Sequence, residues 1–148
     1  MGNSKKLLLL AEKAIKKNIG KVIRKSSLYN TAAWGNTDQP FFLNQVFIIS
    51  SAYTPEKTIE KILQIENDMG RVRTEKNAPR LIDIDILFFN KDIVQTSKLN
   101  IPHIAIQNRR FVLVPLNELS PNFIHPVLQK TIHQLLLICP DKLGVEKI

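Results

Sequence analysis

The sequence predicts a two-layer α+β domain. Segments with the apolar spacing of helices and of strands follow one another in the order α-β-β-α-β-α-α, which is typical of that class. The 148 residues fit one domain, because ~100–200 residues per domain is the usual range. The only cysteine, Cys139, lies in an apolar stretch and excludes an internal disulfide framework. We therefore expect a single domain over residues 1–148 in a reducing compartment.

The first half of the chain contains two predicted helices around two predicted strands. The predicted elements are a helix over 5–18, a strand over 21–29, a strand over 41–49 and a helix over 54–69. Ser4 can cap the first helix, while Thr54 and Pro55 have the residue types preferred at the N-cap and N1 positions of the second. Gly20 and Gly70 stand where these helices should end.

The second half begins with a strand and ends with helices. The predicted elements are a strand over 80–89, a turn at 90–92, a short strand at 93–94, a helix over 110–119 and a tail helix within 126–140. In the tail helix we expect four apolar side chains to pack inward: Ile132, Leu135, Leu136 and Ile138.

The net charge of +8 indicates an anionic partner. The lysines near the first helix are most simply a solvated face: Lys5, Lys6, Lys13, Lys16, Lys17, Lys21 and Lys25. Five arginines gather instead around the strand predicted over 80–89: Arg71, Arg73, Arg80, Arg109 and Arg110. Because arginine offers phosphate a fixed bidentate geometry, this contrast favours a local phosphate site over a diffuse nucleic-acid surface.

The sequence also excludes a membrane span. The early apolar run Leu7–Leu10 is far shorter than the ~20 residues that a spanning helix needs. It is also shorter than the ~7–15 apolar residues of a secretory leader. We therefore expect a cytoplasmic protein without membrane contact.

The strand predicted over 80–89 carries two aspartates, Asp83 and Asp85, on the face opposite its isoleucines. Carboxylates at i and i+2 lie roughly 7 Å apart at Cα and repel each other. They can be the polar face of an edge strand. Alternatively, Mg²⁺ relieves the repulsion, since it is typically held by one or two carboxylates plus substrate phosphates. The neighbouring arginines favour the metal–phosphate interpretation.

Other candidates have two interpretations each. Trp34, in a loop, can stack on a flat ligand or cover the core. Phe42 and Asn44 share a strand face, so the amide can read the edge of a heterocycle beside the ring. Glu66 can form a surface ion pair, and His103 can be a capping residue or a phosphate contact.

Four segments together resemble the signature of the 6-hydroxymethyl-7,8-dihydropterin pyrophosphokinase family. They are Ala78-Pro-Arg-Leu-Ile-Asp-Ile-Asp-Ile-Leu87, Gly70-Arg-Val-Arg73, Ile101-Pro-His103 and Asn108-Arg-Arg-Phe111. The resemblance runs from about Ser26 to Leu119. It implies a ferredoxin-like two-layer sandwich, with helices packed on a mostly antiparallel sheet. It also implies transfer of pyrophosphate from ATP to the pterin in folate biosynthesis, with release of AMP, by a monomer that binds no nucleic acid.

The resemblance further implies roles for individual residues. The catalytic group is Arg71, Arg80, Asp83 and Asp85, with the two aspartates as ligands of two Mg²⁺ ions. The ATP site is Glu66, Arg73, Arg80, Ile86, Lys98, Asn100, His103 and Arg109. The pterin site is Thr31, Ala32, Trp34, Phe42, Asn44 and Phe111. Two departures weaken stacking on the ligands: Lys76-Asn77-Ala78 lacks the family's usual aromatic residue, and Ile104 replaces an aromatic residue after His103.

The family's fold begins with an additional central strand that ends in a Gly-Ser-Asn-type turn. Met1-Gly2-Asn3 stands where that turn would finish, so we expect this first strand to be absent. Its loss would leave backbone groups unpaired, at ~1–3 kcal/mol for each buried group. An inactive truncated fragment or pseudoenzyme is therefore one alternative function. A basic nucleic-acid-binding α+β module is a more distant one.

Overall fold

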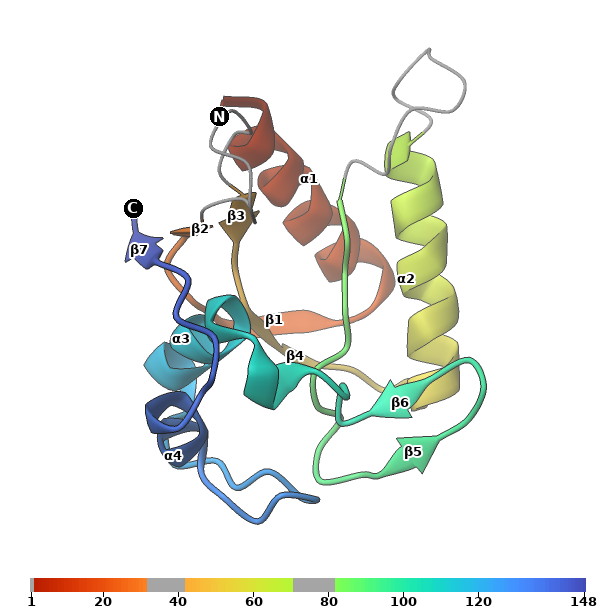
Figure 1. Cartoon of the computed structure of the whole chain (residues 1–148). Coiled ribbons are helices and arrows are strands. Elements are labelled where there is room, and N and C mark those ends of the chain that lie inside the picture. Colours follow the sequence, from red (N-terminus) through yellow and green to blue (C-terminus); the bar gives the residue numbers. More distant parts are fainter. Residues whose placement is uncertain (1, 32–41, 71–81) are drawn as a thin grey trace.

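Figure 1 shows the computed structural model of the chain, in which residues 2–31, 42–70 and 82–148 are described. The helices are α1 (Gly2–Asn18), α2 (Pro55–Gly70), α3 (Arg110–Leu119) and α4 (Ile132–Leu137), with a 3-10 turn η1 (Ile106–Asn108). The strands are β1 (Lys21–Lys25), β2 (Tyr29–Thr31), β3 (Phe42–Asn44), β4 (Phe47–Ser50), β5 (Val94–Gln95), β6 (Asn100–Ile101) and β7 (Val145–Lys147). The predicted α+β class is confirmed, and all of the strand pairs are antiparallel.

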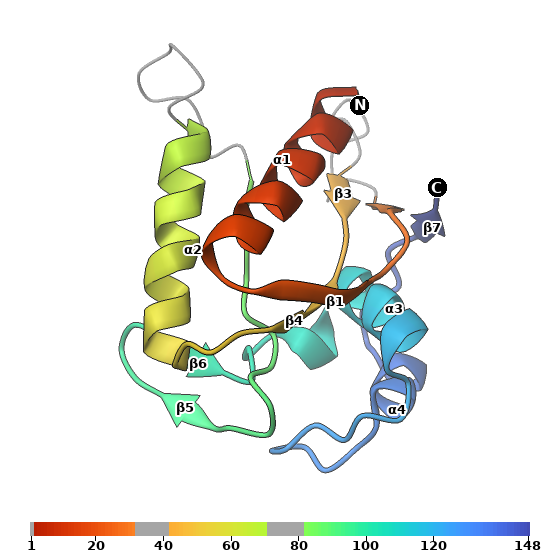
Figure 2. The same cartoon turned by 180° about the vertical axis from the view of Figure 1, so that it is seen from behind.

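A first core forms where α1 and α2 pack together beside the β1–β4 pair. Figure 2 shows the two helices next to each other, with β1 and β4 running past their lower ends. The buried residues of this first core are Ala11, Ile15, Ile19, Ile62, Ile65 and Met69. At the end of α1, Gly20 comes so close to β4 that a Cβ atom would lie 2.1 Å from the carbonyl oxygen of Ser50. Only glycine permits this approach of the two backbones.

Helix α1 begins earlier than predicted. Ser4 lies inside the helix and not at its N-cap, so that assignment is wrong. In α2 the predicted cap is confirmed, because the backbone N–H of Lys57 donates to the hydroxyl of Thr54 at 3.1 Å. Gly70 is the last residue of α2 and does not follow it.

The strands predicted over 21–29 and 41–49 are each split in two. The first part of the earlier strand is β1 and the last part of the later strand is β4, and these two pair with each other. The remaining parts are β2 and β3, which join β7 in a separate three-stranded sheet. Ser26 lies at the break: its hydroxyl accepts from the N–H of Val46 at 2.9 Å, and its carbonyl accepts from the side chain of Gln45 at 2.8 Å. Its own backbone N–H donates to the carbonyl oxygen of Val46 at 2.8 Å, so side-chain bonds are added to backbone pairing at the bend.

A second core forms around α3, which has the predicted bounds, and α4. Its buried residues are Ile106, Leu113, Leu116, Ile132, Leu135 and Cys139. Cys139 is thus a buried core thiol. The inward position predicted for Ile138 is wrong: α4 ends at Leu137, and Ile138 is 63% exposed. Within the described ranges, no helix is both long and apolar enough to cross a membrane.

Of the strand predicted over 80–89, the described residues 82–88 are extended but belong to no strand. In Figure 1 this segment runs as a plain trace past α1 and α2. Its predicted alternation is confirmed from Ile82 to Ile86 but not beyond, since Leu87 and Phe88 are both half-buried against the second core. Ile82, Ile84 and Ile86 are half-buried against the first core, whereas Asp83 and Asp85 are exposed. A strand needs a hydrogen-bonding neighbour, and the β1–β4 sheet does not reach this segment.

Candidate active site

The two motif aspartates are held by a buried carboxylate from α2. Glu66 is only 8% exposed, and its Oε2 atom accepts a 2.7 Å hydrogen bond from the backbone N–H of Ile84. Ile84 lies between Asp83 and Asp85, so this bond fixes the backbone that carries both. Glu66 is therefore not a surface residue, and the arginines with which it was expected to form an ion pair, Arg71 and Arg73, lie outside the described residues.

The donors of this segment suit a cation that also binds a ligand. Among the residues that the structure describes, no three His, Cys, Asp or Glu side chains gather to enclose a metal ion. Asp83 and Asp85 are two exposed carboxylates on one side of an extended segment. Mg²⁺ in nucleotide enzymes is bound by one or two carboxylates plus phosphate oxygens. The donor set therefore fits a phosphate-bound Mg²⁺ ion better than an all-protein cage.

The hairpin of β5 and β6 brings a histidine to the end of the motif segment. The backbone N–H of His103 donates to the carbonyl oxygen of Leu87 at 3.0 Å. The Nδ1 atom of His103 accepts from the N–H of Ala105 at 3.2 Å. The neutral ring therefore carries its proton on Nε2, which can donate to an anionic oxygen.

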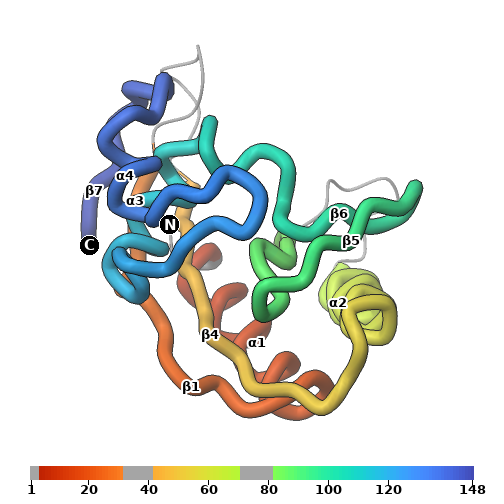
Figure 3. Tube along the Cα trace, turned by 90° about the horizontal axis from the view of Figure 1, so that it is seen from below, coloured from red at the N-terminus to blue at the C-terminus, as the bar shows by residue number. Residues whose placement is uncertain are grey.

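Two further predicted ATP residues lie on the same hairpin. Lys98 is exposed in its turn, and Asn100 is exposed on β6. Figures 1 and 3 show this hairpin beside the start of α2. Ile86 contacts the first core and is half-buried. Lys98 and Asn100 thus lie on the hairpin that leads to His103, and Ile86 lies on the motif segment itself.

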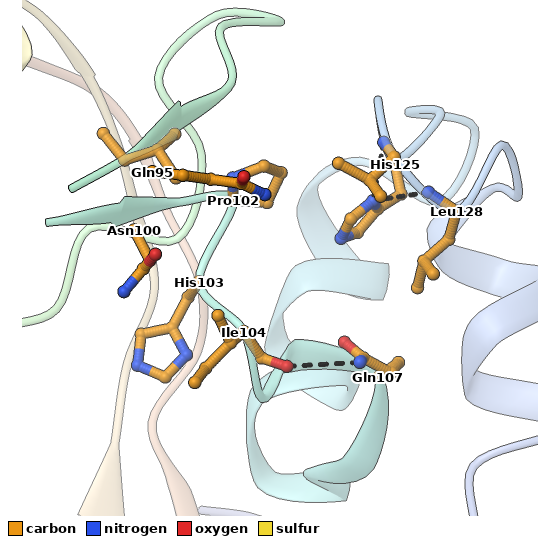
Figure 4. A pocket seen from close by; sticks show the side chains of 10 residues that line it. Gln95, Asn100, Pro102, His103, Ile104, Gln107, His125 and Leu128 are labelled. Carbon is orange, nitrogen blue, oxygen red and sulfur yellow. Dashed lines mark hydrogen bonds between the residues drawn. The ribbon is translucent and has the colours of Figure 1, made fainter. Parts of the chain in front are cut away.

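A pocket of about 180 Å³ lies between this hairpin, η1 and the loop 125–128. Figure 4 shows Asn100 and His103 on one side of it and His125 with Leu128 on the other. The Nδ1 atom of the buried His125 accepts from the backbone N–H groups of Val127 and Leu128 at 3.1 and 3.0 Å. Burial lowers the pKa of His125, so the ring is neutral at pH 7 and serves to hold the loop.

Three of the predicted pterin residues, Thr31, Phe42 and Asn44, lie on the three-stranded sheet. Thr31 pairs with Phe42, and Tyr29 pairs with Asn44, so all four side chains lie on one face. The side-chain amide of Asn44 donates to the hydroxyl of Thr31 at 3.3 Å. Thr31 is buried, whereas Phe42 is 59% exposed. This face offers hydrogen-bonding groups beside an exposed ring.

The start of α3 supplies the remaining predicted contacts. The guanidinium of Arg109 lies 5.7 Å from the centre of the half-buried Phe111 ring, within cation–π range. The backbone N–H of Arg110 donates to the carboxylate of Asp141 at 3.1 Å. Asp141 thereby satisfies one of the free N–H groups at the beginning of this helix.

Five predicted site residues lie outside the described residues: Ala32, Trp34, Arg71, Arg73 and Arg80. The stretch 76–78, where the family's aromatic residue is missing, lies outside them too.

The sequence profile of the family "7,8-dihydro-6-hydroxymethylpterin-pyrophosphokinase (HPPK)" matches residues 1–121. The chain belongs to this family. It is 38% identical over 128 residues to the Methylorubrum extorquens 2-amino-4-hydroxy-6-hydroxymethyldihydropteridine pyrophosphokinase, covering 86% of this chain and 79% of that enzyme. It is 41% identical to the Dictyostelium discoideum folic acid synthesis protein FOL1, covering 83% of this chain but only 19% of that longer protein.

A solved structure shares the fold. The crystal structure of Plasmodium falciparum HPPK-DHPS wild type with SDX-DHP superposes with a TM-score of 0.69 at 20% identity. The match covers 88% of this chain and 40% of that one. At this identity the likeness supports the α+β architecture alone.

Sequence reasoning missed two carboxylates that form hydrogen bonds around α3, which carries Phe111. Glu118, at the end of α3, accepts hydrogen bonds from Ser27 and Tyr29. Asp141 contacts the start of the same helix. The one available signal was the seven-residue spacing of Phe111 and Glu118, which places them on one face of the predicted helix.

Proposed function

We propose that this chain transfers a pyrophosphoryl group from ATP to 6-hydroxymethyl-7,8-dihydropterin. The observation that carries the proposal is the exposed pair Asp83 and Asp85, on a segment whose backbone is held by Glu66. The family match adds the substrate pair, since the relatives are named as pyrophosphokinases of this pterin. The hydroxymethyl oxygen of the pterin attacks the β-phosphorus of ATP, the bond from that phosphorus to the α-phosphate oxygen breaks, and AMP leaves.

Asp83 and Asp85 would hold Mg²⁺, two ions in our proposal. When bound, Mg²⁺ neutralises phosphate charge and orients the triphosphate. Around it, His103 donates from Nε2 to a phosphate oxygen. Arg109 and the undescribed Arg71, Arg73 and Arg80 add positive charge. Catalysis of this kind is chiefly positioning and electrostatic stabilisation.

The remaining predicted residues bind the two organic groups. Ile86, Lys98, Asn100 and Glu66 border the nucleotide. Asn44 and Thr31 hydrogen-bond the edge of the pterin, and its faces lie against Phe111 and Phe42, with Ala32 and Trp34 completing the site. The hydrogen bond from Asn44 to Thr31 supports this assignment, because it orients the amide on the same face as Phe42.

We further propose a ferredoxin-like sheet in which an additional strand lies beside residues 82–88. The extended, alternating and half-buried form of that segment supports the proposal. A single domain over 1–148, a monomeric state and a cytoplasmic location without nucleic acid complete the proposal. Addition of the family's first strand before Met1 should then raise the free energy of unfolding, and no change would contradict the strand.

The test of the reaction is identification of its products. Purified protein with ATP, Mg²⁺ and the pterin should form AMP and pterin pyrophosphate in equal amounts, and no AMP without the pterin. ADP in place of AMP would show phosphoryl transfer instead and would contradict the proposal. Absence of both products from folded protein would favour the inactive-fragment alternative.

A further inference from the structure

The network around Glu118 ties α3 to the strand that carries Thr31. The carboxylate accepts from the Ser27 backbone N–H at 3.0 Å, from the Ser27 hydroxyl at 3.0 Å and from the Tyr29 hydroxyl at 2.6 Å. Such charge-assisted bonds are stronger than bonds between neutral groups. A second tie runs from the Arg24 guanidinium to the carbonyl oxygen of Leu119 at 2.9 Å. The end of α3 is thus bound at several points to β1 and β2.

The same helix carries Phe111 at its other end. Seven residues separate Phe111 from Glu118, which is close to two helical turns and a rise of roughly 10 Å. Both side chains therefore lie on one face of α3, and α3 contacts β2 and β3. On β2 and β3, Tyr29 shares its sheet face with Thr31 and Asn44. The hydrogen bond between Glu118 and Tyr29 therefore joins the face of α3 that carries Phe111 to the sheet face that carries Thr31 and Asn44.

We propose that Glu118 is a positioning residue for pterin binding. Through Tyr29 and Ser27 it fixes how α3 sits on the sheet, and so it sets the separation between the Phe111 ring and the polar pair Thr31 and Asn44. A flat heterocycle needs that separation to be constant, because it must contact a ring on its face and polar groups on its edge at once. This inference rests on the proposed function, since it assumes that pterin occupies this space.

A merely structural carboxylate network elsewhere provides the control. Glu12 on α1 is buried, and it accepts from Lys25 and Lys16, each at 3.1 Å. It contacts neither α3 nor the predicted pterin residues in any of these bonds. Glu12→Gln should therefore lower stability without a specific effect on either substrate.

The experiment compares Tyr29→Phe, Glu118→Gln and Glu12→Gln with the wild-type chain. Tyr29→Phe keeps the buried ring and removes only the hydroxyl, so it should fold even if a Glu118 variant does not. We expect Tyr29→Phe and Glu118→Gln each to raise KM for the pterin about 10-fold, with KM for ATP changed less than about twofold. The double variant should be little worse than either single one, because both remove the same tie. Glu12→Gln should change neither KM.

Equilibrium binding of the pterin, in the presence of Mg²⁺ and a non-hydrolysable ATP analogue, separates the possible failures. Wild-type protein that does not bind pterin would overturn the proposed function and the role of Glu118 together. Wild-type protein that binds pterin, with unchanged pterin affinity in Tyr29→Phe and Glu118→Gln, would overturn the role of Glu118 alone. Equal loss of ATP and pterin affinity in these variants would also contradict it, since that pattern indicates general destabilisation.

Discussion

The two cores of the molecule differ in how completely their side chains are buried. In the second core Ile106, Leu113 and Ile132 are fully buried. In the first core the motif isoleucines are only half-buried, and the sheet beside them has two strands. The second core includes α3, which carries Phe111 and Glu118, whereas the aspartates lie on the segment that packs against the first core. Alternation thus places the aspartates outward, and the hydrogen bond from the Ile84 N–H to Glu66 ties their segment to α2.

The largest expected effect is on catalysis. Asp85→Ala should lower turnover by at least ~10³-fold while leaving the circular dichroism spectrum unchanged, because the residue is exposed and phosphoryl transfer depends on charge neutralisation. Asp92→Ala, which removes an exposed aspartate from the turn after the motif, is the matched control and should be nearly fully active. Normal turnover by folded Asp85→Ala would remove the metal assignment.

Glu66→Gln tests whether the position of the motif aspartates beside the first core depends on the buried Glu66 carboxylate. The substitution replaces a charge-assisted bond to the Ile84 N–H by a weaker one. We expect kcat to fall about 10- to 100-fold, since a small displacement of catalytic groups has effects of this size. Steady-state kinetics measures the change, and a variant with normal kcat would show that the aspartates are held by other means.

A matched pair of substitutions compares the two cores directly. Ile132→Ala should lower the free energy of unfolding by about 3–4 kcal/mol, because the side chain is completely buried. Ile84→Ala should cost about 1–2 kcal/mol, because the half-buried side chain loses less contact. Urea denaturation of both variants measures the difference. Equal losses of unfolding free energy would mean that Ile84 is as completely packed in the first core as Ile132 is in the second.

The smallest effect concerns pH. Burial, together with the hydrogen bond to Glu118 and the charge of Glu118, raises the pKa of Tyr29 to about 12 from 10.0. Between these values the unfolded chain loses the phenolic proton and the folded chain keeps it, so the free energy of unfolding should fall as the pH rises from about 10 to 12. Denaturant titrations should show a shallower fall for Tyr29→Phe. An identical pH dependence would contradict the buried hydrogen bond.

The Glu118 carboxylate should also make the stability of the protein depend on pH at acid pH. Burial would raise the pKa of Glu118, but the hydrogen bonds from Tyr29 and Ser27 outweigh it and hold the pKa below 4.5. The stability that this group supplies is therefore present above pH 4.5 and is lost as the pH falls below that value. Because the side chain is exposed, we expect only a small loss, measured against Glu118→Gln.

Local signals predicted helices well and long-range bonds poorly. The bounds of α3 and the Thr54 cap of α2 follow from periodicity and end residues, which act within a few positions. The splitting of the strands at Ser26 depends on partners about 20 residues away. The prediction of a strand in the motif segment was wrong for a related reason. Its alternation is a local signal, whereas a strand requires a hydrogen-bonded neighbouring strand.

The candidate site divides in the same way. Asp83, Asp85, His103 and Arg109 could be selected from short motifs. Glu66 and Glu118 act through partners 18 and 89 residues away in the sequence, at Ile84 and Tyr29. No spacing rule within one element predicts such contacts. The residues proposed to touch substrate could thus be chosen from short motifs, whereas the hydrogen bonds of Glu66 and Glu118 became visible only in the structure.

The central claim is that Asp83 and Asp85 bind ATP through Mg²⁺. Calorimetric titration of ATP into the wild-type chain, with and without Mg²⁺, tests it most directly when repeated on the Asp83→Asn/Asp85→Asn variant. We predict that Mg²⁺ strengthens ATP binding to the wild-type chain at least ~10-fold and has little effect on the folded variant. Equal strengthening of ATP binding by Mg²⁺ in both proteins would contradict the account.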